Sequence, residues 1–363
     1  MGRALELAAR GAGLTSPNPV VGAVLVAAGR AVGEGFHTSA GGAHAEALAL
    51  GQAGAAARGS VLYVTLEPCN HIGRTPPCVE AIRASGVARV VVATRDPNPR
   101  VTGGGAAALS RAGLDVSLGC REAEAVSLNR VFITAARLGR PHVTVKWAAT
   151  LDGTTGDAGR QSRWITGPES RLEAHRLRSL ADAVVVGIGT ALADDPALDV
   201  RLGDPWPREP LRVVVDSRAR LPDSARLIDA GKPERALVAV TDAADPGRVR
   251  SLEARGVTVL NCKSQDGRVD LCDLLSRLGA LDAGGILVEG GGRLAGGFLE
   301  AGLVDRIVAF TAPMLLGGGT APRPLEGAGV RLPDAVRLER LSARLVGADW
   351  MTEADVARGA VGS

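Results

Sequence analysis

Aromatic residues are scarce in this chain of 363 residues, which contains four Trp, four Phe and one Tyr. Because 46% of the residues are nevertheless hydrophobic, the cores must be built mostly from Val, Leu, Ile and Ala. The net charge of +3 is small for this length. So few aromatic residues and so little net charge argue against a nucleic-acid or an anionic membrane surface as partner.

Long apolar runs and an even set of cysteines are also missing. No run of 18 apolar residues occurs, so we expect no transmembrane span. Residues 1–13 have no apolar core of a signal peptide. The five cysteines disfavour a disulfide framework and indicate a reducing cytoplasm. We interpret Cys120, Cys262 and Cys272 as ordinary small apolar residues.

Both halves of the chain alternate expected strands and helices, which predicts α/β architecture with buried strands. The run Gly139-Arg140-Pro141 breaks the pattern, so we expect domains at 1–140 and 141–363. In the first half we expect strands at 20–27, 61–66, 89–94 and 114–118, and helices at 1–10, 44–58, 75–85, 104–112 and 121–138. In the second half we expect strands at 142–149, 183–186, 211–215, 235–240, 257–260, 285–288 and 304–311, and a frayed end from about residue 352.

One constellation of residues in the first half predicts a catalytic zinc site. His44, Cys69 and Cys78 offer one imidazole and two thiolates, which leaves one zinc position for water. Glu46 follows the histidine at a distance of two residues, where a carboxylate can carry protons without binding the metal. We expect His44 and Glu46 to open a helix, Cys69 to follow a strand, and Cys78 to lie in the first turn of the next helix. This is the pattern of zinc deaminases.

Two alternatives remain open at this point. His71 could serve as a fourth ligand of a closed structural zinc site, although Glu46 would then have no role. His44 could instead be only the cap of a helix. In the catalytic interpretation, zinc supplies hydroxide that attacks a ring carbon bearing an exocyclic amine, while Glu46 moves protons to the ring nitrogen and the leaving ammonia.

Several segments of the first half resemble one known family. They are Ser16–Val24, Gly35–His37, His44–Glu46, Glu67–Cys78 and Asp96–Pro99. They resemble the deaminase half of the bifunctional riboflavin-biosynthesis deaminase/reductase family, in which the eight-residue gap between the cysteines is itself characteristic. The resemblance implies a cytidine-deaminase-like α/β/α layered domain that acts on 2,5-diamino-6-ribosylamino-4(3H)-pyrimidinone 5′-phosphate.

The same resemblance places three further residues near that substrate: Asn18, His71 and Arg74. The guanidinium of Arg74 suits a phosphate group. For Asn18, an Asx turn between two prolines is an equally good interpretation.

The second half carries an ordered set of loop motifs at the ends of expected strands. They are Lys146–Gly153, Ser162–Gly167, Gly187–Thr190, Val215–Arg218 and Glu289–Leu294. Glycines in such loops let the backbone approach a phosphate. None of the loops has the G-x-G-x-x-G spacing of a standard dinucleotide fold.

This set resembles the reductase half of the same family over nearly all of residues 142–350. The resemblance implies a dihydrofolate-reductase-like wound α/β domain that uses NADPH to reduce the ribosyl group of 5-amino-6-(5-phosphoribosylamino)uracil to ribityl. By motif match the cofactor residues are Ala148, Trp164, Thr190, Asp194, Ser217, Gly291, Gly292, Arg293, Leu294, Ala295, Gly296 and Gly297. The substrate residues are Ser162, Arg178, Leu198, Arg201, Glu289 and Lys146.

Some of these roles have plain alternatives. Ser217 and Arg218 together suggest a site for the 2′-phosphate of NADPH. Lys146 could polarise the sugar or be a surface lysine at a strand end, and Arg178 and Arg201 could be ordinary solvated charges.

We therefore expect a two-site cytoplasmic enzyme that binds Zn²⁺, NADPH and phosphoribosyl pyrimidines and forms a homo-oligomer. Two other functions compete with this one. The chain could be a nucleic-acid-editing deaminase, or a deaminase with a non-catalytic C-terminal binding domain.

Overall fold

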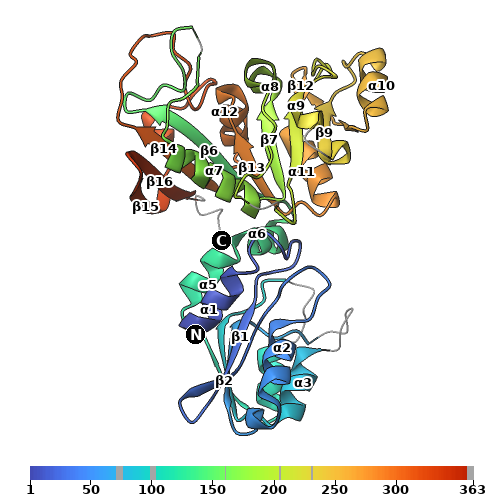
Figure 1. The fold of residues 1–363 in the computed structure, drawn as a ribbon, viewed down its shortest axis with the longest axis vertical. Coiled ribbons are helices and arrows are strands. Elements are labelled where there is room, and N and C mark those ends of the chain that lie inside the picture. The colour runs from blue at the N-terminus through green and yellow to red at the C-terminus, as the bar shows by residue number, and fades with distance from the viewer. Residues whose placement is uncertain (71–76, 99–103, 160, 204–205, 230–231, 358–363) are drawn as a thin grey trace. The chain divides into compact units, whose positions relative to one another are not determined.

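The computed structural model describes residues 1–70, 77–98, 104–159, 161–203, 206–229 and 232–357 (Figure 1). The chain divides into two compact units, Met1–Arg140 and Pro141–Ser363, and each is described here by itself. Among the described residues, no helix is both long and apolar enough to cross a membrane.

The N-terminal unit contains a five-stranded sheet with the strand order β2-β1-β3-β4-β5. Its strands are β1 (Gly22–Ala27), β2 (Arg30–Phe36), β3 (Val61–Leu66), β4 (Arg89–Thr94) and β5 (Asp115–Leu118). Strands β3, β4 and β5 run parallel, whereas β1 is antiparallel to both of its neighbours. The carboxyl ends of β3 and β4 therefore meet at one edge, where side chains from the following loops can converge.

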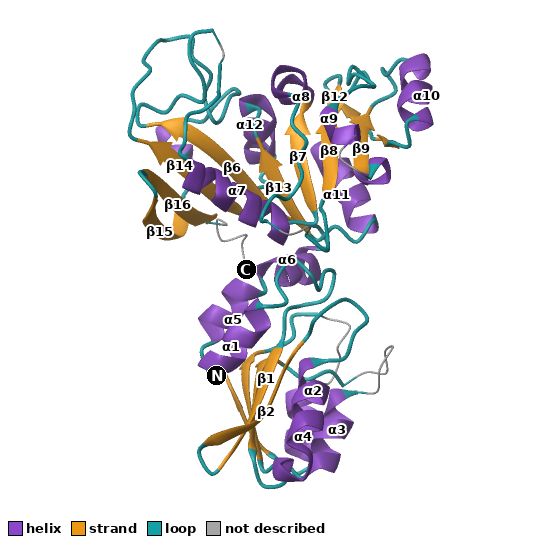
Figure 2. Cartoon of the chain, viewed as in Figure 1, coloured by secondary structure: helices purple, strands orange, loops and turns teal. Residues whose placement is uncertain are grey.

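Helices cover both faces of this sheet (Figure 2). They are α1 (Gly2–Ala9), α2 (Ala45–Ala53), α3 (Cys78–Ser85), α4 (Gly105–Arg111), α5 (Glu122–Leu128) and α6 (Arg130–Leu138), with a 3₁₀ turn at Gly54–Ala57. Side chains of α2, α3 and α4 pack on Ala23, Leu25, Leu62 and Val64, while α1 packs on Val24. Alternating residues of one strand thus reach opposite helix layers. The expected three-layer α/β/α arrangement is confirmed.

Two departures from the expected elements occur in this unit. Strand β2 has no counterpart among the expected strands, because Gly33 and Gly35 weaken its hydrophobic pattern. A Cβ on either glycine would lie within 2.4 Å of a backbone oxygen of α2, so the helix approaches this edge strand closely. The single helix expected at 121–138 is wrong, since it breaks into α5 and α6 at Asn129. The buried Asn129 amide pairs with both the N–H and the C=O of Val20, each at 2.9 Å.

The C-terminal unit contains a nine-stranded sheet with the order β10-β9-β8-β7-β13-β6-β14-β16-β15. Its strands are β6 (His142–Thr150), β7 (Ala183–Gly187), β8 (Leu211–Val215), β9 (Ala236–Val240), β10 (Thr258–Asn261), β13 (Gly285–Glu289), β14 (Arg306–Ala312), β15 (Leu338–Val346) and β16 (Asp349–Val356). In this order, every strand between β10 at one edge and β14 is parallel to its neighbours. Strands β16 and β15 complete the sheet as an antiparallel hairpin. Strands β11 (Ser264–Gln265) and β12 (Arg268–Val269) form a separate small hairpin.

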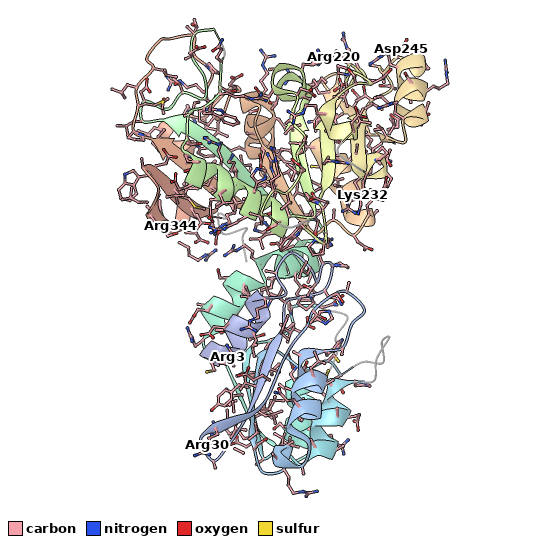
Figure 3. All side chains as sticks on the ribbon, in the orientation of Figure 1. Arg3, Arg30, Arg220, Lys232, Asp245 and Arg344 are labelled. Carbon is pink, nitrogen blue, oxygen red and sulfur yellow. The ribbon has the colours of Figure 1, made fainter. Side chains whose placement is uncertain are left out.

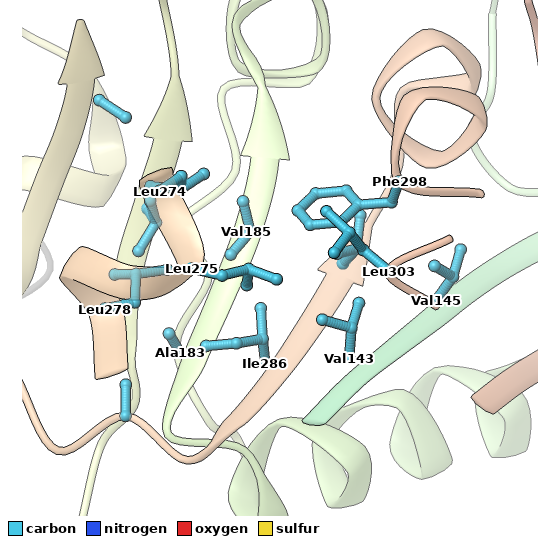
Figure 4. Packing of buried hydrophobic residues seen from close by; sticks show 14 of the residues in the cluster. Val143, Val145, Ala183, Val185, Leu274, Leu275, Leu278, Ile286, Phe298 and Leu303 are labelled. Carbon is cyan, nitrogen blue, oxygen red and sulfur yellow. The ribbon is translucent and has the colours of Figure 1, made fainter. Parts of the chain in front are cut away.

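Two hydrophobic clusters on opposite faces hold this sheet. The helices are α7 (Pro168–Leu180), α8 (Ile188–Asp194), α9 (Arg226–Asp229), α10 (Pro246–Ala254), α11 (Leu271–Ala280) and α12 (Gly292–Glu300), with 3₁₀ turns at Pro233–Arg235 and Leu332–Asp334. One cluster joins α11 and α12 to the sheet through Leu274, Leu278 and Phe298 (Figure 4). The other includes Leu227 of α9 and Leu252 of α10. Helices on both faces of a mostly parallel sheet confirm the expected wound α/β unit.

The expected fraying from about residue 352 is wrong, because β16 continues to Val356 between β14 and β15. Its pairing is tied to the rest of the unit by a buried side chain. The Asp349 carboxylate accepts hydrogen bonds from Gly167 N at 2.8 Å and from the Ser170 hydroxyl at 2.6 Å. The polar sequence of this segment contains no sign of these long-range partners.

Candidate active sites

Three side chains that were expected to bind a metal lie together in the N-terminal unit. His44 is the residue before α2, Cys69 follows β3, and Cys78 begins α3. Their ligand atoms all lie within 4.8 Å of one another. The expected positions of these residues at two helix starts and one strand end are confirmed.

The spacing of these atoms fits zinc. His44 Nδ1 lies 3.1 Å from Cys78 Sγ and 3.5 Å from Cys69 Sγ. Bonds of about 2.0 Å to nitrogen and about 2.3 Å to sulfur at tetrahedral angles place these atoms about 3.5 Å apart. The three described residues therefore fit three corners of a zinc tetrahedron. His71, the alternative fourth ligand, and Arg74 both lie outside the described residues.

The surroundings of Cys69 favour its thiolate form. Hydrogen bonding from Cys78 and from His44 lowers the pKa of Cys69 to about 4. The Cys78 backbone N–H also points at Cys69 Sγ over 3.3 Å, at the first turn of α3. Backbone donors at a helix start stabilise a thiolate, which is the form that binds metal.

Glu46 lies beside this cluster in the first turn of α2, where it is buried with 4% of its surface exposed. Burial raises its pKa above the ordinary value. A buried carboxyl next to a metal cluster is placed to exchange protons with a metal-activated water molecule.

Asn18 is connected to the same cluster through a histidine. The Asn18 side-chain amide lies 3.1 Å from His37 Nε2, and His37 Nδ1 lies 3.0 Å from the carbonyl of Ala43. Because that carbonyl can only accept, Nδ1 carries the proton, and Nε2 accepts from the Asn18 amide. The side-chain carbonyl oxygen of Asn18 then remains available to accept a hydrogen bond from a ligand. The His37 and His44 rings are 5.8 Å apart.

The C-terminal unit has a large cleft of about 1190 Å³ at the carboxyl ends of β6, β7, β8 and β13. In a parallel sheet this is the edge at which ligands bind. The cleft is larger than a typical small-molecule pocket of about 300–1,000 Å³, so it can hold a dinucleotide together with a second ligand. Gly296 and Arg218 are the expected C-terminal site residues that do not line it.

Gly296 faces the outside of the cleft for a steric reason. A Cβ at this position would lie 1.9 Å from the Glu326 carbonyl oxygen. The glycine therefore lets α12 pack against the loop that contains Glu326. Its expected contact with the cofactor stays a prediction, whereas Gly291 and Gly292 line the cleft at the start of α12.

A buried group of charges lies where β13 ends beside the middle of β6. Arg178 Nε and Nη2 donate to the two Glu289 carboxylate oxygens at 2.9 and 2.8 Å. Burial alone would raise the pKa of Glu289, but the charges of Arg178 and Lys146 lower it to about 2. Burial lowers the pKa of Lys146. The interpretations of Lys146 as a surface residue and of Arg178 as a solvated charge are therefore wrong.

Other expected residues line the same cleft. The Ser162 hydroxyl donates to Asp194 at 3.2 Å, and Leu198 is buried. Arg201 lines the cleft as an exposed side chain that pairs with Asp199 at 3.2 Å.

The cleft also includes residues that the sequence interpretation did not single out as site residues. Among them are Arg171, whose guanidinium stacks 4.5 Å from the Trp164 ring centre, and His175. Burial lowers the pKa of His175, and its Nδ1 accepts the backbone N–H of Arg201 at 3.2 Å. Their positions on α7 at helical spacing from Arg178 were the only available signal.

The N-terminal unit has a His/Cys/Cys cluster with a buried Glu, and the C-terminal unit is a wound α/β unit with a dinucleotide-sized cleft. Together they define a two-part enzyme that combines a zinc deaminase with a nucleotide-dependent reductase. Comparisons with known proteins agree. Residues 1–94 match the family model of the cytidine and deoxycytidylate deaminase zinc-binding region, and residues 141–352 match the RibD C-terminal domain.

The relatives cover nearly the whole chain. The riboflavin biosynthesis protein RibD of Aquifex aeolicus (strain VF5) is 46% identical over 87% of this chain and 86% of that protein, and RibD of Escherichia coli (strain K12) is 43% identical over 87% and 88%. The structure of Acinetobacter baumannii RibD, form 1, has a TM-score of 0.87 at 38% identity and covers 98% of both chains.

The chain belongs to the RibD family of riboflavin-biosynthesis enzymes. It is a bifunctional enzyme, a zinc-dependent deaminase and an NADPH-dependent reductase. The alternatives of a nucleic-acid editor and of a non-catalytic second half are not favoured.

Proposed function

We propose that residues 1–140 deaminate 2,5-diamino-6-ribosylamino-4(3H)-pyrimidinone 5′-phosphate and that residues 141–363 reduce the deaminated product to its ribityl form. The observation that carries the first reaction is the cluster of His44, Cys69 and Cys78 with the buried Glu46 beside it. A Thermotoga maritima protein of known structure, with a TM-score of 0.85 at 34% identity, is named for both activities, as a diaminohydroxyphosphoribosylaminopyrimidine deaminase and a 5-amino-6-(5-phosphoribosylamino)uracil reductase.

In the deaminase, His44, Cys69 and Cys78 hold the metal. Bound zinc lowers the pKa of a water molecule toward neutrality. Glu46 would take a proton from the attacking water and return it to the departing amine, so that one water would be consumed and one ammonia released. Asn18 presents its carbonyl oxygen to the pyrimidine, with His37 fixing the orientation of the amide. His71 and Arg74 contact the same substrate, Arg74 at its phosphate.

In the reductase, bound NADPH supplies a hydride for C1′ of the opened sugar. Lys146 donates a hydrogen bond to a sugar oxygen, and the low pKa of Glu289 keeps a fixed negative charge beside it. Arg178 holds Glu289 in one orientation through two hydrogen bonds.

Further residues complete the reductase site. Ser162, Leu198 and Arg201 form the walls of the substrate site. The nucleotide contacts Ala148, Trp164, Thr190, Asp194, Ser217 and Gly291 to Ala295, with Gly297.

Glu46→Gln tests the deaminase assignment. We expect the variant to retain one zinc per chain and to lose deamination by about 10²-fold or more, because the amide cannot carry a proton. Glu80→Gln, an exposed glutamate of α3, is the matched control. Zinc content is measured by elemental analysis, and a fall in zinc that parallels the fall in activity would contradict the proton-carrier role.

Arg178→Ala tests the reductase assignment. We expect loss of NADPH oxidation, followed at 340 nm with the deaminated substrate, while deamination is retained. Arg176→Ala, two residues earlier on α7 and exposed, is the control. Equal losses of the two activities in Arg178→Ala would refute separate sites.

We also propose that the enzyme works in the cytoplasm as a homo-oligomer. Large apolar side chains are exposed on the β15–β16 hairpin, where Leu345 and Trp350 face each other across the two strands with 59% and 50% exposure. An exposed apolar edge strand is a common site of association. Light scattering after size exclusion tests this proposal, and a monomer mass at micromolar concentration would contradict it.

A further inference from the structure

The adenosine end of the reductase cleft contains a group of arginines that differs from the one suggested by the sequence. Ser217 lies just beyond β8 and lines the cleft together with Arg220, Arg226 and Arg268. Arg218, the residue next to Ser217 that the sequence suggested, does not line it. Figure 3 labels Arg220 at the end of this unit at which Figure 1 labels α8 and β12.

Arg268 reaches this place because of a small hairpin. The two-residue turn Asp266-Gly267 joins β11 to β12, and both residues have positive φ, at 52° and 72°. Asp-Gly is a favoured sequence for such a turn. The hairpin is fixed to the end of β8 by a hydrogen bond from Val269 N to the Ser217 hydroxyl oxygen at 3.1 Å. Because that oxygen accepts from Val269, the Ser217 O–H remains available to donate to a ligand.

The acidic residue of this corner points away from the cleft. Asp216 is completely buried, and its carboxylate accepts the backbone N–H of Leu221 at 2.8 Å. Its other oxygen lies 3.5 Å from Arg220 Nε. An acidic side chain at the end of such a strand often binds the ribose hydroxyls of a nucleotide and repels a 2′-phosphate. Here the buried Asp216 carboxylate is turned into its own turn, so that no carboxylate of this turn lines the cleft beside Ser217.

Arg268 is left with its charge unused by the protein. Its guanidinium forms no ion pair or hydrogen bond with the residues that the structure describes. A planar guanidinium is well suited to two oxygens of one phosphate. The order β8-β7-β13 puts the Ser217 corner two strand spacings, about 10 Å, from the phosphate-binding start of α12. This direction leads from the pyrophosphate toward the adenosine of a bound dinucleotide.

We propose that Arg268 and Arg220, together with the Ser217 hydroxyl, bind the 2′-phosphate of NADPH and determine the preference for NADPH over NADH. This inference rests on the NADPH-dependent reductase activity of the C-terminal unit. The β11–β12 hairpin is then a specificity element, since it carries one of the two arginines into the cleft. Arg218 has no part in it.

Binding of two cofactor fragments to the full chain tests the proposal directly. Adenosine 2′,5′-bisphosphate carries the 2′-phosphate and AMP lacks it, so the ratio of their dissociation constants by calorimetry isolates this group. We expect the wild-type preference for the bisphosphate to fall about 10- to 100-fold in Arg268→Ala and in Arg220→Ala, because each removes a charge-assisted hydrogen bond. AMP affinity in the same samples shows that the cleft is intact.

Arg218→Ala is the matched control from the same turn. If it loses the preference while Arg268→Ala and Arg220→Ala keep it, the proposal is overturned in favour of the assignment made from sequence. A failure of the proposed reductase function would be recognised separately, because the wild-type protein would then not oxidise NADPH with the deaminated substrate. A parallel change in the KM ratio of NADPH to NADH, with kcat little changed, is expected in the two arginine variants.

Discussion

Glu289 is the most informative residue to perturb, because its charge is buried in the C-terminal unit. In Glu289→Gln, Arg178 loses the partner of two hydrogen bonds and Lys146 loses the nearest negative charge. The side chains of Arg178 and Glu289 are only 13% and 9% exposed. Removal of one member of a buried ion pair costs about 3–5 kcal/mol, since the other charge remains buried without compensation.

The pKa of Glu289 gives a second, independent value for the stability that this carboxylate contributes, and the two values are of similar size. A carboxyl with a pKa of 4.5 in the unfolded chain and about 2 in the folded one stabilises the fold by about 3 kcal/mol at neutral pH. Because the folded pKa is the lower one, this contribution is complete above pH 4.5. It is lost progressively as the pH falls toward 2. The difference in stability between wild type and Glu289→Gln should therefore shrink over this range.

Tryptophan fluorescence in urea measures this stability selectively. All four tryptophans, Trp147, Trp164, Trp206 and Trp350, belong to the C-terminal unit, so the signal follows that unit alone. We expect a loss of about 3 kcal/mol in Glu289→Gln at pH 7 and a smaller difference at pH 3.

Asp334→Asn provides the control for this experiment. It removes an exposed pair with Arg331 and should change stability by less than about 0.5 kcal/mol. The reasoning is refuted if Glu289→Gln matches wild type at pH 7, or if the difference stays constant between pH 7 and pH 3.

Three further outcomes are expected. Asn129→Ala should destabilise the N-terminal unit by about 2–5 kcal/mol, because the buried N–H and C=O of Val20 lose their partners; deaminase activity that survives heating as in wild type would contradict this. Removal of zinc by a chelator should abolish deamination but leave NADPH oxidation of the deaminated substrate, and zinc should restore the first activity. Gly296→Ala should cost about 1–3 kcal/mol in urea unfolding followed by tryptophan fluorescence, whereas Gly51→Ala, with open space around its Cβ, should be neutral or stabilising in thermal unfolding.

Element types were predictable where the local pattern decided them. Most parallel strands in both units are short apolar runs of Val, Leu, Ile and Ala, which fit buried strands. The missed elements depend on distant partners. Strand β2 forms because its glycines admit α2, the helix at 121–138 breaks because Asn129 pairs with Val20, and β16 persists because it lies between two other strands. Propensity carries no information on such contacts.

The sequence by itself determined the chemistry of the zinc site, because a histidine, two cysteines and a nearby glutamate can be recognised by residue type and order. Only the tertiary structure decided which charges act together in the reductase. Glu289 and Arg178 are 111 residues apart, and Val269, which follows Arg268 in its hairpin, bonds to Ser217 across 52 residues. Side chains so distant in the chain become partners only when the fold brings a helix or a hairpin against the carboxyl ends of the parallel strands. The neighbouring Arg218 suggested a phosphate site from sequence, whereas Arg220 and Arg268 are the arginines that line the cleft and that we propose for this role.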